Sequence, residues 1–327
     1  MRTYHWIITV IILTMIAACS GPRIKLFSDE TEPLKEYTLE GSKADRILLI
    51  PVNGVISDVP QRGFMTTTPS IVQQVVSQLR KAEKDKRIKA VVLKINSPGG
   101  TITASDLLYH EISSYKEKTG AKIIVAMMDL ATSGAYYMSL PADMIIAHPT
   151  TVTGSIGVIF LQPKVSGLMN KIGLGVDVQK YGKNKDMGSP FRDSSEEERK
   201  LLQKGVDDFG ARFISLVVSH RKPQQATLEE IATARFFLAQ DALRLGLVDK
   251  IGYLSDAINE SKKLSGASPD ASVIVYRRTE FPEDNYYNNT AIISGDSKIS
   301  AISIDLPESL SFKAGFYYLW PGAIESN

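Results

Sequence analysis

Apolar runs of strand length alternate along this chain with segments that have the apolar period of a helix. The runs are apolar on both faces, as strands buried inside a sheet are. Because strands joined by helices pair in parallel, this order predicts an α/β fold with a largely parallel sheet and flanking helices. The expected strands cover residues 46–52, 88–95, 122–128, 144–148, 156–160 and 175–180.

Helices are expected between and after these strands. The first covers 69–84, with Thr68 as its N-cap. The longest begins at Ser195, which has the spacing of a capping box with Glu198, and runs to about Lys222. Further helices are expected after Gly100 and over 227–233, 239–245 and 253–264.

The composition sets the broad class of protein. Hydrophobic residues make up 43% of the chain and charged residues 23%, which is enough apolar material for a sizeable core. The 38 basic and 36 acidic residues leave a net charge of +2, and no long basic run occurs. The charge therefore gives no reason to expect a nucleic-acid partner.

The N-terminus has the features of an export signal. Arg2 precedes an uncharged run from Trp6 to Ala18, which ends in small residues before Cys19, the only cysteine. This end resembles the lipobox of bacterial lipoproteins, in which the cysteine is lipidated and becomes the mature N-terminus. It predicts an extracytoplasmic, periplasmic-side protein anchored to a membrane through Cys19. An uncleaved signal anchor stays open, because the uncharged stretch continues to Pro22 and approaches the ~20 residues that span a bilayer.

Four segments follow from these patterns. Residues 1–18 are the expected signal peptide, and the polar residues 19–45 a tether. Residues 46–266 hold the α/β domain. Residues 267–327 form an extension of unassigned structure, in which 272–277 has the composition of a strand. The apolar sequence GFYYLWPG near its end could dock on the body of the protein or on a membrane surface.

Three glycine-containing turns carry what hydrolysis by a serine needs: an exposed hydroxyl, a base, and N–H donors for the oxyanion. NSPGG at 96–100 lies between a strand and a helix, where glycine amides and the helix N-terminus favour negative charge. ATSGAYY at 131–137 puts Ser133 at a helix start, as a nucleophile or as a simple N-cap. YGKNKDMGSPF at 181–191 carries lysines, which are solvated surface or, in the neutral form, a base.

The familiar histidine-based sites find little support. Of the four histidines, His5 lies in the signal, and none of the others lies in a recognisable catalytic pattern. No G-x-S-x-G sequence surrounds a serine, and no metal-ligand spacing occurs. A serine nucleophile in this chain is therefore expected to have a lysine partner, and no metal or other cofactor is expected.

Together the motifs resemble the signal peptide peptidase A family, the S49 serine peptidases, which share the fold of the Clp protease and crotonase group. NSPGG, ATSGAYY, TGSIG, YGKNKDMGSPF and LAQDALRLGLVDKIG all occur in the family's order. The resemblance extends from Ile47 to Ser265, so it implies that 46–266 is a peptidase domain. One copy of the catalytic unit is present, as in the short form of the family.

The resemblance assigns roles to single residues. The nucleophile falls on Ser133 and the lysine base on Lys185, with Lys183 in the same loop as its rival. Ser155 in TGSIG would hold the lysine amine. The oxyanion would be bound by the backbone N–H groups of Gly100 and, less directly implied, of the glycine that follows the nucleophile, Gly134.

The implied activity is endopeptidase cleavage of peptide substrates, such as signal peptide remnants or other apolar segments near the membrane. Short members of the family assemble into homo-oligomeric rings, in which an active site can borrow loops from a neighbour. Two rival functions stay open. Acyl-CoA chemistry of the crotonase type fits the fold, although export argues against a cytoplasmic cofactor. A catalytically idle lipoprotein scaffold would use Ser133 only as a cap.

Overall fold

The computed structural model describes residues 32–62, 67–281, 284–288 and 314–323. The chain divides into two units, Met1–Pro33 and Leu34–Asn327, and only the last two residues of the first are described. The expected signal peptide and Cys19 lie outside the described residues. All that follows concerns the second unit.

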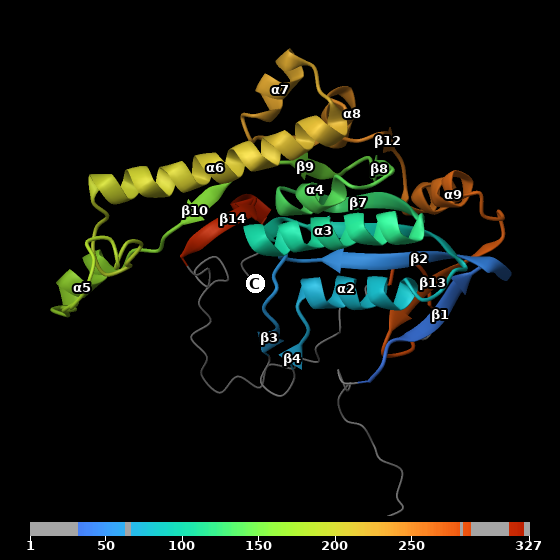
Figure 1. Cartoon of the computed structure of the whole chain (residues 1–327), viewed down its shortest axis with the longest axis horizontal. Coiled ribbons are helices and arrows are strands. Elements are labelled where there is room, and N and C mark those ends of the chain that lie inside the picture. The colour runs from blue at the N-terminus through green and yellow to red at the C-terminus, as the bar shows by residue number, and fades with distance from the viewer. Residues whose placement is uncertain (1–31, 63–66, 282–283, 289–313, 324–327) are drawn as a thin grey trace, which may run out of the picture. The chain divides into compact units, whose positions relative to one another are not determined.

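A nine-stranded, mostly parallel sheet forms the centre of this unit (Figure 1). Six parallel strands follow one another across it: β13 (Ala271–Arg277), β2 (Lys43–Asn53), β5 (Ile88–Ser97), β7 (Lys122–Thr132), β8 (Met144–Ala147) and β12 (Lys250–Ile251). β1 (Lys35–Glu40) is antiparallel to β13 at the edge. β9 (Val152–Gly154) continues beside the end of β7, and β11 (Phe236–Leu238) is antiparallel to β9. The expected α/β fold is confirmed.

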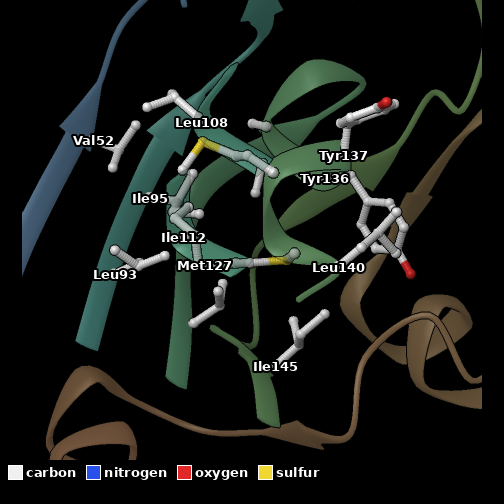
Figure 2. Close-up of a cluster of buried hydrophobic side chains, with 14 of the residues drawn as sticks. Val52, Leu93, Ile95, Leu108, Ile112, Met127, Tyr136, Tyr137, Leu140 and Ile145 are labelled. Atoms are coloured by element: carbon white, nitrogen blue, oxygen red, sulfur yellow. The ribbon is translucent and has the colours of Figure 1, made fainter. Parts of the chain in front are cut away.

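Helices cover both faces of the sheet, which explains why the central strands are apolar throughout. Leu48 and Ile50 of β2 face the core beneath α2 (Ile71–Ala82) and α3 (Ile102–Thr119). Ile47 and Leu49 face the opposite core with α9 (Leu254–Ser265). Figure 2 shows the first core, where side chains of β5 and β7 meet those of α3 and α4 (Gly134–Ser139).

A helical arm extends outward from the domain, on the side opposite β1 and α9 (Figure 1). It consists of α5 (Ser166–Ile172), a loop, and the long helix α6 (Glu196–Arg221), followed by α7 (Gln225–Ile231) and α8 (Ala239–Arg244). The capping box of α6 between Ser195 and Glu198 is confirmed. In the described part of the chain, no helix combines the length and the apolar character needed to cross a bilayer.

A separate three-stranded antiparallel sheet lies beside the first turns of α3. Its order is β10 (Ile159–Leu161), β14 (Gly315–Leu319) and β6 (Gly99–Thr101). The apolar cluster near the C-terminus therefore docks on the body of the protein, one of the two expected places. A short pair, β3 (Gln61–Arg62) with β4 (Thr67–Thr68), and the 3-10 turn Pro321–Ala323 complete the elements.

Several expectations are wrong in detail. Residues 35–40 are a strand and not part of a tether, because β1 pairs with β13 and extends the sheet beyond 46–266. Residues 175–180 form no strand and are exposed. Of the strand expected at 156–160, only residues 159 and 160 are in a strand, β10, and residues 156–158 lie in the connection from β9. The N-cap of α2 is Ser70, which forms a capping box with Gln73.

Candidate active site

Ser133 lies in a strained turn between β7 and α4. Its φ is 52° and its ψ −115°, a conformation that residues other than glycine rarely adopt. Its side chain makes no N-cap hydrogen bond, so the role of a simple cap is wrong. Only 1% of the residue is exposed. Strain of this kind is retained where it positions a functional group, and here it fixes the direction of the Ser133 side chain.

The neighbouring strand holds this turn in place. The Ser133 N–H donates to the Gly154 carbonyl oxygen at 2.7 Å, at the point where β9 ends beside β7. Ser155 follows directly, also at positive φ (49°), and its N–H donates to the Arg235 carbonyl oxygen at 2.9 Å. The structure therefore brings the segment of Ser155 next to the Ser133 turn.

The glycines of the first two turns converge beside Ser133. A methyl group on Gly134 would lie 3.2 Å from the Gly100 nitrogen, and one on Gly99 would lie 2.7 Å from the Gly134 nitrogen. Gly99 itself has a φ of 95°, which L side chains rarely adopt. Because no side chain separates these turns, the amides of Gly100 and Gly134 lie close together. Two neighbouring N–H groups beside a serine are the components of an oxyanion hole.

Lys185 does not reach this site within one chain. It lies in the loop between α5 and α6, which Figure 1 shows at the outer end of α6, away from α4. The residue is exposed, and among the described residues its amine has no hydrogen-bond or ion-pair partner. Lys183 is also exposed and forms an ion pair with Glu197. A single chain therefore brings together Ser133, Gly100, Gly134 and the Ser155 segment, but not the expected base.

An ionic clamp gives the loop around Lys185 a defined structure. Arg192 donates to Asp186 Oδ2 at 2.8 Å and to Glu198 Oε2 at 2.9 Å, and Lys180 also pairs with Asp186. The hydrogen bonds from Arg192 lower the pKa of Glu198 to about 2 and hold the pKa of Asp186 well below its usual range. The residues on both sides of Lys185 are thereby tied to the start of α6.

Asp106, Tyr137 and Arg212 form a polar network that was not predicted from the sequence. The Tyr137 hydroxyl donates to Asp106 Oδ1 at 2.5 Å, and Arg212 pairs with the same oxygen at 2.6 Å. Burial raises the pKa of Tyr137, and its hydrogen bond to Asp106 raises it further. The three residues are 31 and 106 positions apart, so no local spacing could reveal the network. It joins α3 and α6 to α4, the helix that begins directly after Ser133.

Comparison with known proteins agrees with this geometry. The profile of Peptidase family S49 matches residues 115–268, and that of Clp protease matches residues 65–151. A protein of Enterococcus faecium provisionally named signal peptide peptidase SppA is 36% identical over 294 residues, 89% of this chain and 84% of that protein.

Two further relatives are longer proteins. Protease 4 of Haemophilus influenzae is 29% identical over 275 residues, 83% of this chain and 43% of its own length. The chloroplastic serine protease SPPA of Arabidopsis thaliana is 34% identical over 235 residues, 70% of this chain and 34% of its own length. With its α/β fold of the Clp protease type, the chain belongs to the signal peptide peptidase A family of S49 serine peptidases.

Proposed function

We propose that this serine peptidase is an endopeptidase with a Ser133–Lys185 dyad and an oxyanion hole formed by Gly100 and Gly134. The observation that carries the proposal is the position of Ser133, in a strained turn beside the two glycine amides. The Ser133 side chain forms no cap hydrogen bond, so its hydroxyl is not engaged at the start of α4. Ser155, on the adjacent segment, is assigned to hold the lysine amine.

The proposed reaction is acyl transfer. The neutral amine of Lys185 takes the proton of the Ser133 hydroxyl, which adds to a peptide carbonyl carbon. The amides of Gly100 and Gly134 stabilise the oxyanion. Lys185 then gives the proton to the leaving amine, and water hydrolyses the ester of Ser133.

In this proposal Lys185 comes from an adjoining copy of the chain in a homo-oligomeric ring. Two observations support it. Lys185 lies on the helical arm, away from the Ser133 turn of its own chain. The same arm exposes apolar side chains that a neighbouring subunit would cover, among them Leu168, Ile172 and Leu174. Lys185 is preferred to Lys183 because Glu197 already pairs with Lys183.

The proposed substrates are apolar peptides, including the remnants of cleaved signal peptides. The name of the Enterococcus faecium relative refers to signal peptides. Lipidation of Cys19 would hold the enzyme on the periplasmic side of a membrane, where such remnants are released. Replacing Cys19 with serine should move the protein from the membrane to the soluble fraction.

Mixing of inactive variants tests the shared dyad. Ser133→Ala and Lys185→Ala should each abolish hydrolysis of a fluorogenic apolar peptide, whereas Lys183→Ala should retain most of it. Co-assembly of Ser133→Ala with Lys185→Ala should restore part of the activity, because some sites then combine an intact serine with an intact lysine.

Co-assembly of Ser133→Ala with a Ser133→Ala, Lys185→Ala double variant is the matched control and should stay inactive. Activity that survives Ser133→Ala would exclude Ser133 as the nucleophile. Loss of activity in Lys183→Ala together with full activity in Lys185→Ala would assign the base to Lys183. No recovery in mixed rings would place both members of the dyad in one chain.

A further inference from the structure

Arg235, the residue directly before β11, holds Ser155 through its backbone. The Arg235 carbonyl oxygen accepts a hydrogen bond from the Ser155 N–H at 2.9 Å. The strand that follows keeps the same alignment, since Phe236 of β11 lies opposite Gly154 of β9. Ser155 is at positive φ, a conformation that has to be held by its surroundings. The direction of the Ser155 side chain therefore depends on the position of Arg235.

The side chain of Arg235 supports the residue before Ser155. Its guanidinium carbon lies 4.1 Å from the centre of the Phe237 ring, in the arrangement of a cation–π contact. The Phe237 ring is fully buried and packs directly against Gly154, where an added methyl group would lie 2.4 Å from the ring carbon Cδ2. Arg235 thus fixes Ser155 in two ways, at its N–H through the backbone and at Gly154 through the guanidinium and the ring.

Glu230 of α7 fixes the guanidinium of Arg235. Its Oε1 accepts from Arg235 Nη2 at 2.5 Å and from Arg244 Nη2 at 3.2 Å. These hydrogen bonds, the one from Arg235 most of all, lower the pKa of Glu230, so its carboxylate is charged at neutral pH. The side chains of Glu230 and Arg235 are 32% and 46% exposed, and ion pairs with this exposure add little to stability. The pair therefore orients the guanidinium more than it holds the fold together.

Backbone strain is concentrated in the same place. In the described part of the chain, the residues other than glycine with positive φ are Ser133, Ser155, Lys222 and Ala234. Lys222 is the C-cap of α6, where a left-handed conformation is usual. The other three are joined by two hydrogen bonds: the Ser133 N–H donates to the residue before Ser155, and the Ser155 N–H donates to the residue after Ala234. Such strain persists where the structure holds a functional group in place, so the turn that carries Arg235 belongs to the site.

We propose that Arg235 is a positioning residue that aims the Ser155 hydroxyl at the lysine amine of the dyad. The proposal rests on the proposed function, in which Ser155 holds the amine of Lys185. Without the guanidinium, the Phe237 ring and the turn before β11 lose a shared support, and the Ser155 hydroxyl is less often directed at the amine. Arg235 orients the base and not the substrate, so its loss should lower kcat and leave KM unchanged.

Steady-state hydrolysis of a fluorogenic apolar peptide by the full-length protein tests the proposal. Arg235→Met keeps most of the side-chain length without the charged plane, and should lower kcat about tenfold or more with KM within about twofold of the wild type. Arg244→Met is the matched control, because it removes the other partner of Glu230 and leaves the contact of Arg235 with Phe237 in place. Its kcat should equal that of the wild type within about twofold. Both variants should unfold thermally like the wild type, since exposed ion pairs add little to stability.

A second background separates positioning of Ser155 from a general effect on the site. Ser155→Ala keeps the backbone hydrogen bond to Arg235 and removes only the hydroxyl, so it should lower kcat. Arg235→Met added to it should lower kcat further by no more than about twofold, because the two changes remove the same interaction. Glu230→Gln leaves the guanidinium in place without its charged partner, and should lower kcat about threefold or more. This variant tests the same support if Arg235→Met does not fold.

The outcomes separate this inference from the proposed function. Wild-type kcat in Arg235→Met or in Glu230→Gln would overturn the role of Arg235 and leave the dyad intact. A raised KM at unchanged kcat would overturn it as well, as would an equal loss from Arg235→Met with and without the Ser155 hydroxyl. Wild-type kcat in Ser155→Ala would instead reject the proposed role of Ser155, and the role of Arg235 with it.

Discussion

The amide of Ser133 donates to the carbonyl oxygen of Gly154, 2.7 Å away, and this bond joins the strained turn to the neighbouring strand. Gly154 is itself at positive φ (81°), and a side chain there would overlap the ring of Phe237. Two residues with unusual backbone angles therefore support each other across the end of the sheet. The direction of the Ser133 side chain is fixed by this pair, before any substrate binds.

The strain at Ser133 predicts an unusual order of stabilities. Backbone strain of this kind costs of order 1–3 kcal/mol, and glycine avoids most of it. We expect Ser133→Gly to be more stable than Ser133→Ala by about 1 kcal/mol, after allowance for the greater flexibility of glycine in the unfolded chain. Both variants should be inactive. Chemical denaturation of the two proteins, compared at equal concentration, measures the difference.

Ser139, six residues further along, supplies the control. It is the last residue of α4, where the backbone is still helical and glycine is less favourable than alanine by up to about 1 kcal/mol. Ser139→Gly should therefore be less stable than Ser139→Ala, the reverse of the order at Ser133. The same order at both sites would show that the Ser133 turn is not strained.

The central strands could be predicted from the sequence because burial on both faces leaves a continuous apolar run. Ile47 to Ile50 belong to β2 and Val91 to Leu93 to β5, and all are buried. The start of α6 was equally clear, since the capping box of Ser195 with Glu198 is a local pattern. The glycine turns could be placed at strand ends because each one directly follows such an apolar run.

Features that depend on distant pairing could not be predicted. β1 contains only exposed and half-buried residues at the edge of the sheet, so its apolar pattern is weak. β14 is held by β6 and β10, which are far away in the sequence. The position of Lys185 depends on how the arm folds, and no spacing along the chain encodes it. The network of Asp106, Tyr137 and Arg212 depends on the same tertiary contacts.

Close packing at Gly134 predicts a large effect from one methyl group. A side chain there would overlap the Ser105 hydroxyl and press on the Gly100 amide. Overpacking in a dense core costs typically 1–3 kcal/mol, and we expect Gly134→Ala to lose that much stability and at least tenfold in kcat/KM.

Gly210→Ala on α6 is the control, because nothing lies within 4 Å of its added methyl group. That variant should be more stable than the wild type by about 0.5–1 kcal/mol, since alanine is the better helix former. Equal behaviour of the two variants would contradict the proposed closeness of the oxyanion amides.

The clamp around Lys185 predicts a stability that depends on pH. The pKa values of Asp186 and Glu198 are lowered by Arg192. A depressed carboxyl pKa contributes stability that is fully present above the unfolded value of about 4 and is lost as the pH falls toward 2. We expect Arg192→Met to be less stable than the wild type at pH 7, with a difference that shrinks between about pH 5 and pH 2. Denaturation curves across this range measure it.

Arg199→Met tests whether the effect belongs to the clamp. Arg199 pairs with Glu196 on the exposed surface of the same helix, and surface pairs contribute about 0–1 kcal/mol. Its loss should change stability little at any pH. Arg192→Met should also lower kcat for peptide hydrolysis more than Arg199→Met does, because it releases the loop that carries Lys185. A pH-independent loss in Arg192→Met would mean that the guanidinium acts through packing alone.

β14 pairs with β6, the strand of Gly99 and Gly100, and we expect it to occupy the place of an extended peptide substrate. This position predicts competition with added peptides, which can be measured without catalysis in the Ser133→Ala background. A tethered segment acts at an effective concentration of order millimolar, so it should weaken binding of a free peptide with the sequence of residues 314–320, AGFYYLW, by about tenfold or more. Removal of residues 314–327 should therefore tighten the Kd of this peptide by that factor. Tyr318→Asp in the full-length chain should also tighten the Kd, because the pocket that Tyr137 and Phe213 form around the Tyr318 ring then becomes free while the rest of the chain is retained.

The control is the same peptide with its second tyrosine replaced by aspartate, which should bind none of these proteins well. A Kd that is the same with and without the tail would show that β14 does not occupy the peptide-binding groove.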